Sequence, residues 1–169
     1  MLNFKMLSIS SILWSLLWIF IVYVSVQRFP WTIEHDYPPD VREAAKITPP
    51  DEKGKKQALI FMIFSFIAVA SSAIGSVFLS YDAANLSSRT VFFHLLILCM
   101  TWNIVDLVVL DWIFICFLNS KWFIFPGTEH CKGNKDYKFH FAGFLKGCVA
   151  MTVVAGILTG FCLLLFRLM

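Results

Sequence analysis

Four long apolar segments dominate the hydrophobic pattern of the chain, and polar stretches separate them. Each segment has at least 20 residues, and an α-helix that crosses a hydrocarbon core of about 30 Å needs about 20. The pattern therefore predicts four membrane-spanning helices joined by polar connectors. The predicted spans are residues 7–26, 57–80, 91–118 and 141–168, and the predicted connectors are residues 27–56, 81–90 and 119–140.

The composition agrees with a membrane protein and excludes a soluble globular domain. Hydrophobic residues make up 59% of the chain and charged residues 15%, whereas soluble domains have about 45–50% and about 25%. We expect one all-α transmembrane domain over residues 1–169, a four-helix transmembrane bundle whose main partner is the lipid bilayer. The net charge of +3 is too small to suggest nucleic acid as a partner.

Basic residues are distributed unevenly among the connectors. Ten lysines and arginines lie in residues 27–56 and 119–140, whereas the opposite side has only Lys5, Arg89 and Arg167. Because short basic loops stay in the cytoplasm, we expect these two connectors to be cytoplasmic and both termini to lie outside the cell membrane. The alternative for residues 1–26 is a cleaved signal peptide, but its apolar run would usually be shorter, about 7–15 residues.

The first connector is predicted to contain a short helix. Asp40 and Glu43 have the spacing of a capping box, which favours a helix over about residues 41–47. Trp31 and Tyr37 belong to a residue class that collects at the level of the lipid headgroups. We therefore expect this connector to lie on the membrane surface.

The third span carries three polar side chains in an apolar context: Asn103, Asp106 and Asp111. A carboxylate near the middle of a span costs about 2.5–3.5 kcal/mol on insertion scales. On a regular α-helix, at about 100° per residue, the three residues lie within an arc of about 140°. They are therefore expected to share a face that turns toward the bundle interior or a water-filled cavity, as an ion or proton site.

Depth in the bilayer, counted at 1.5 Å per residue, suggests partners for these groups. Lys146 of the fourth span lies nearly level with Asp111, so we expect an ion pair between them. Asp106 has no cation at its level, and burial favours its neutral form, so we expect it to take up and release a proton. The alternative is a structural role, in which a neutral Asp106 bonds Thr152 or Ser71 and holds the helices together. Hydroxyl groups predicted to lie beside the site belong to Thr152, Ser71 and Ser72.

Small residues predict helix packing, and the cysteines bear on metal binding, but both patterns are less specific than the carboxylates of the third span. Gly143 and Gly147, and likewise Gly156 and Gly160, have the small-x-x-x-small spacing of helix packing, which favours a homo-oligomer or docking on a larger membrane partner. The five cysteines are scattered without a metal-ligand spacing, so neither a metal nor a cofactor is expected. His94, near the outer end of its span, is expected to be interfacial.

Three functions fit these features. The leading hypothesis is a proton- or cation-coupled transporter or channel component that uses the intramembrane carboxylates. The second is a membrane enzyme that acts at the cytoplasmic interface on a lipid-borne substrate, although no catalytic motif identifies its residues. The third is an accessory subunit of a larger complex. The polar candidates for the enzyme hypothesis are Glu34, His35, Asp36, Glu129, His130 and His140.

Overall fold

Four long helices form the protein in a computed structural model that describes residues 1–82 and 86–168. All four are long and apolar enough to cross a membrane, and the described residues form no strand. The four predicted helical segments are therefore confirmed to within a few residues at their ends. The helices are α1 (Phe4–Arg28), α3 (Glu52–Phe78), α4 (Ser88–Val105) with its continuation η4 (Asp106–Phe117), and α5 (Tyr137–Leu168).

The third span changes its helical form at Asp106. From Asp106 to Phe117 it is a π-helix, and Leu118 N donates a hydrogen bond to Ile113 O, five residues back, at 2.9 Å. π-helices are rare and usually last a single turn, often at functional sites. The prediction assumed a regular α-helix throughout, so it could not give the directions of side chains beyond Asp106.

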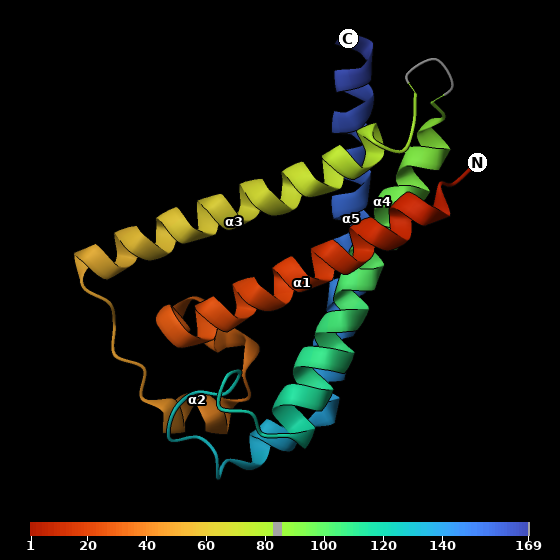
Figure 1. The fold of residues 1–169 in the computed structure, drawn as a ribbon. Coiled ribbons are helices and arrows are strands. Elements are labelled where there is room, and N and C mark those ends of the chain that lie inside the picture. Colours follow the sequence, from red (N-terminus) through yellow and green to blue (C-terminus); the bar gives the residue numbers. More distant parts are fainter. Residues whose placement is uncertain (83–85, 169) are drawn as a thin grey trace.

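The helices pack as two antiparallel pairs inclined to one another (Figure 1). One pair is α4 with α5, and the other is α1 with α3. Where the pairs cross, buried side chains from all four helices form a continuous core. Fully buried members of this core are Ala73, Val77, Val91, Leu95, Cys99, Ala155 and Cys162.

Connectors 27–56 and 119–140 pack against each other at the end of the molecule that lies away from both termini (Figure 1). We call this the connector end. Tyr37 is only 3% exposed, and its hydroxyl donates a hydrogen bond of 2.5 Å to Phe123 O. Gln27 Nε2 also donates to Lys121 O at 3.2 Å. The expectation that Tyr37 lies among lipid headgroups is therefore wrong, because the third connector covers it.

The short helix of the first connector is α2 (Pro39–Ala45), close to the predicted residues 41–47. Asp40, however, does not cap it, since the N-cap position is Pro38. Asp40 Oδ2 instead accepts a hydrogen bond from Gly133 N at 2.8 Å. A Cβ added to Gly133 would overlap Asp40 and lie 2.8 Å from Pro38 Cβ, so this contact between the connectors requires glycine.

Tyr37→Phe is expected to destabilise the connector end. The substitution removes the donor to Phe123 O and leaves a buried carbonyl without a partner, which costs about 1–3 kcal/mol. The free energy of unfolding in detergent micelles would measure the loss. Tyr23→Phe is the matched control, because Tyr23 is 39% exposed; an equal loss in both variants would contradict the interpretation.

Candidate functional site

Asp106 begins the π-helix and turns toward α1. Trp18 Nε1 donates a hydrogen bond of 2.6 Å to Asp106 Oδ1, and the carboxyl is half-buried. The Trp18 ring also packs edge-on against Trp102 at 4.5 Å, and Trp102 packs against Trp14 at 5.4 Å. These three rings, which we call the tryptophan cluster, lie beside Asp106 on the side away from the connector end.

Asp111 makes an ion pair with His140, the fourth residue of α5. Asp111 Oδ1 and His140 Nδ1 are 3.0 Å apart, and their side chains are 20% and 3% exposed. The pair is charged when the His140 imidazole is protonated. Among the described residues, the buried His140 Nε2 has no hydrogen-bond partner.

The predicted Asp111–Lys146 pair is wrong. Lys146 lies on the exposed surface of α5 and makes no ion pair within 4 Å in the described part of the chain. The two residues do not lie level with each other, because α5 begins at Tyr137 rather than near residue 141. Lys146 lies six residues beyond His140, which is about 9 Å further along the helix axis. Asp111 instead faces the first turns of α5, where His140 lies.

Asn103 joins α4 to α5 and does not contact the carboxylates through a hydrogen bond. Its Nδ2 donates to Phe144 O at 3.2 Å and to Cys148 Sγ at 3.4 Å. A Cβ added to Gly147 would overlap the Asn103 amide. Gly147 therefore permits this close approach, and Asn103 is a packing residue rather than a member of a shared polar face.

The three hydroxyl residues predicted beside the site lie elsewhere. Thr152, Ser71 and Ser72 are all exposed. Thr152 Oγ1 donates to Cys148 O and Ser72 Oγ donates to Val69 O, both within their own helices at 2.8 Å. The predicted polar layer therefore does not form, and Trp18 takes the place beside Asp106 that was assigned to these hydroxyls.

Titratable groups lie near one another between the connector end and Asp106, although no hydrogen bond of the described residues joins Asp36 or Asp106 to the Asp111–His140 pair. Asp36, in the short 3-10 helix Glu34–Asp36 (η2), has a side chain that is 67% exposed and lies 3.3 Å from His35 Nε2. Asp36 is close enough to Asp111 and His140 for their charges to interact, and Asp106 is likewise close to Asp111. These groups form a row that runs from an exposed carboxylate through a buried pair to a half-buried carboxyl inside the span.

The residues of the enzyme hypothesis are not brought together as one set. Glu129 and His130 are exposed, whereas His140 is buried against Asp111. Only Asp36 of the first connector interacts with the charge of His140. Among the described residues, no three His, Cys, Asp or Glu side chains lie close enough together to hold a metal ion.

Sequence reasoning missed Trp18 and misplaced His94. Trp14 and Trp18 are four residues apart and so share one face of a helix, a signal that the aromatic composition obscured. His94 is fully buried rather than interfacial. Its Nε2 lies 2.5 Å from Ser76 Oγ and its Nδ1 3.1 Å from Tyr81 OH, so it joins α4 to the end of α3.

Comparison with known proteins gives no relative from which a function can be transferred. No family model matches the chain, and no curated protein and no solved structure is similar to it. The basis for a proposed function is therefore the chemistry of the site itself.

A double-mutant cycle will test the Asp111–His140 pair. We expect Asp111→Asn and His140→Gln each to destabilise the protein by about 1–3 kcal/mol, because each removes one of the two ionisable groups of a largely buried pair. The double variant should lose less than the sum. The measurement is the free energy of unfolding in micelles.

The same cycle between Asp111→Asn and Lys146→Met is the matched control. Since these two side chains do not form an ion pair, their effects should add. Additive effects for Asp111 with His140, together with coupling between Asp111 and Lys146, would contradict the observed pairing.

Proposed function

We propose that this chain is a proton-conducting component of a membrane transporter or channel, with Asp106 as its intramembrane proton site. The observation that carries the proposal is the row from exposed Asp36, through the Asp111–His140 pair, to Asp106. Ionisable groups inside a span are costly, and they commonly mark ion pathways or proton relays.

The chemistry of the partners favours a proton over a metal cation. A bound cation needs several oxygen ligands that converge on one point. Here, in contrast, the Trp18 indole N–H donates to Asp106, and the His140 imidazole lies 3.0 Å from an oxygen of Asp111. An N–H donor competes with a metal ion for the lone pairs of the same oxygen. The same donor does not prevent the carboxyl from gaining and losing a proton.

His140 has the properties of a relay between Asp36 and Asp111. Its Nε2 is buried without a partner among the described residues. In the neutral ring with the proton on Nδ1, this nitrogen has a free lone pair for an incoming proton. When Nε2 takes up a proton, Nδ1 gives its own to Asp111, and the ring becomes neutral with the proton on Nε2. A return of the proton to Nδ1 then resets the relay, and Asp111 passes its proton on to Asp106.

Trp18 controls the next step in this proposal. Its indole N–H stabilises the charged form of Asp106, because a hydrogen bond to an ionised acceptor is about twice as strong as one to a neutral acceptor. Protonation of Asp106 therefore weakens the contact with Trp18. Release of the proton to the opposite side requires the tryptophan cluster to move away from Asp106.

The oligomeric part of the proposal rests on α5. Side chains added at Gly156 and Gly160, which lie one turn apart on one face, would meet nothing within 4 Å, so these two small residues are not used for packing within the chain. Small residues let helices approach closely in a membrane. We assign the glycine face of α5 to contact with a second copy or a larger membrane partner. Four membrane-spanning helices alone enclose too little interior volume for a transport pathway.

Asp106→Asn is expected to abolish proton flux while preserving the fold. The amide keeps the size of the side chain and an oxygen that accepts from Trp18, but it cannot exchange a proton. A pH-sensitive dye inside liposomes that hold the purified protein, with an imposed membrane potential, would report the flux.

Thr152→Val is the matched control for this experiment, because Thr152 is exposed on α5 and lies outside the row. His130→Ala tests the enzyme hypothesis, and we expect it to leave the flux unchanged. Wild-type flux in a folded Asp106→Asn variant would rule out Asp106 as the proton site.

Cysteine labelling will test the proposed orientation, in which the connector end is cytoplasmic in the cell membrane. Cys131 lies in the third connector and is partly exposed, whereas Cys99, Cys116 and Cys162 are buried. Burial together with the charges of Asp40 and Glu129 raises the pKa of the Cys131 thiol, so labelling should be done at alkaline pH. An impermeant maleimide should label Cys131 only after permeabilisation, and Cys131→Ser should remove the signal; labelling in intact cells would reverse the orientation.

A further inference from the structure

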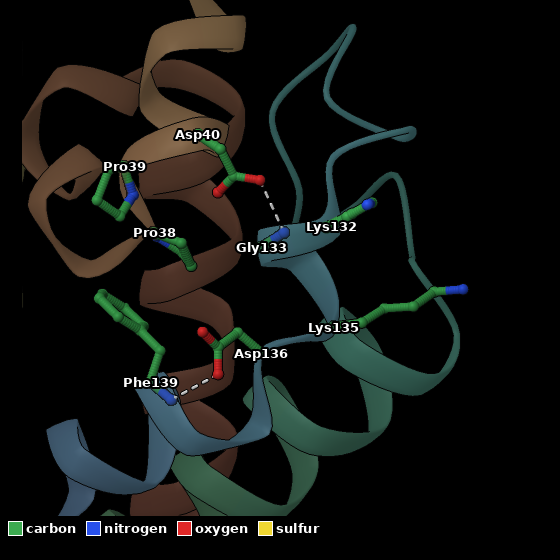
Figure 2. Close-up of a pocket in the computed structure, with 8 residues that line it drawn as sticks. All are labelled: Pro38, Pro39, Asp40, Lys132, Gly133, Lys135, Asp136 and Phe139. Carbon is green, nitrogen blue, oxygen red and sulfur yellow. Dashed lines mark hydrogen bonds between the residues drawn. The ribbon is translucent and has the colours of Figure 1, made fainter.

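A cavity of about 440 Å³ lies between the two connectors, at the start of α5. Its lining includes Pro38, Asp40, Lys132, Lys135, Asp136 and Phe139, and Figure 2 shows these side chains. None of them belongs to the proton row. The cavity therefore requires an explanation of its own.

Each carboxylate of the cavity has one oxygen in use and one free. Asp40 Oδ2 accepts from Gly133 N, and Asp136 Oδ1 accepts from Phe139 N at 3.0 Å. The second oxygens of Asp40 and Asp136 accept no hydrogen bond from the described residues. In Figure 2 they point into the space that Pro38 also borders, so they are available to a donor in the cavity.

Two lysines add the opposite charge. Lys132 and Lys135 are exposed and form no ion pair within 4 Å in the described part of the chain. They extend to the outer side of the cavity, away from the free carboxylate oxygens (Figure 2). The cavity thus has an acidic inner part and a basic rim, with no net charge from these four residues.

Lys146 extends this arrangement into the membrane. It lies seven residues after Phe139, which is two helical turns, so both residues occupy the same face of α5. Ala142 and Gly143 between them are exposed as well. Side chains of a helix tilt toward its N-terminus, so a lysine at this position is within reach of a lipid headgroup that projects from the cavity along α5. A lysine on an apolar face without an intramolecular partner needs a counter-charge or access to the headgroup layer.

We propose that this cavity and the adjoining face of α5 bind a zwitterionic phospholipid whose headgroup has a primary ammonium, of the phosphatidylethanolamine type. The ammonium donates hydrogen bonds to the free oxygens of Asp40 and Asp136. The phosphate lies between the rim lysines and Lys146, and an acyl chain follows Ala142 and Gly143 along α5.

The charges of the site distinguish this lipid from its competitors. An anionic headgroup without an amine would place negative charge beside Asp40 and Asp136 and leave both free oxygens unpaired. A choline headgroup carries a positive charge but has no N–H to donate. A soluble phosphoethanolamine ester has the right headgroup but no acyl chain, so it gains nothing from apolar contact with Ala142 and Gly143.

Native mass spectrometry of the full-length protein in micelles will measure lipid binding directly. The probes are phosphatidylethanolamine, phosphatidylcholine and phosphatidylglycerol with the same acyl chains, and glycerophosphoethanolamine as the soluble competitor. We expect phosphatidylethanolamine to bind about tenfold more tightly than the other two lipids, which corresponds to one charge-assisted hydrogen bond. The soluble ester should not displace it at equal concentration.

Substitutions at Asp40, Asp136 and Lys146 test which side chains contact the lipid. Asp40→Asn with Asp136→Asn keeps an acceptor for Gly133 N and for the first turn of α5, since asparagine is also a good N-cap residue. This double variant should lose the preference for phosphatidylethanolamine over phosphatidylcholine. Lys146→Met should weaken binding of both lipids, whereas Lys121→Met, at an exposed connector lysine outside the cavity, should change neither.

Equal affinity for the three lipids would overturn the proposal. A preference for phosphatidylglycerol would also overturn it, since it would identify a simple basic site. Displacement by the soluble ester at equal concentration would assign the cavity to a soluble ligand instead of a lipid. An unchanged preference in the Asp40→Asn, Asp136→Asn variant would exclude the carboxylates as the selective groups.

Discussion

The contact between Asp111 and His140 joins the long apolar helices at the point where the polar connectors pack onto them. It links the π-helical part of the third span to the first turns of α5. A carboxylate at this position needs a partner, because a charge withdrawn from water is costly unless it is paired. Asp111 points toward His140, and His140 is buried by this contact. Asp36 lies near enough to both residues for its charge to interact with theirs.

The pair also explains why polar groups are unevenly distributed along the helices. On the side of the connector end, charged and titratable groups form the row from Asp36 to Asp106. Beyond Asp106 the tryptophan cluster and then an apolar core follow. Polar groups reappear in the interior at His94, bonded to Ser76 and Tyr81. An ionisable site reached from one side and closed by aromatic rings on the other is consistent with controlled proton passage.

The connectors form a structured part of the protein with a core of their own. Tyr37 and Phe123 are joined by a buried hydrogen bond, and Asp40 is fixed by Gly133 N. These contacts hold the cavity beside α5 in shape. The proposed proton row and the proposed lipid site therefore both depend on the packing of the connectors.

The sequence by itself determined the helical class, the four apolar segments, the short helix after Pro38 and the presence of Asp106 and Asp111 within an apolar segment, because length, hydropathy and composition are local properties. Tertiary structure decided the partners. Sequence spacing fixed neither the level nor the rotation of these side chains, since α5 begins at Tyr137 and the third long helix becomes π-helical at Asp106. Lys146 therefore faces outward and His140 meets Asp111, while Trp18, from a helix distant in the sequence, reaches Asp106 only through the packing of α1 against α4.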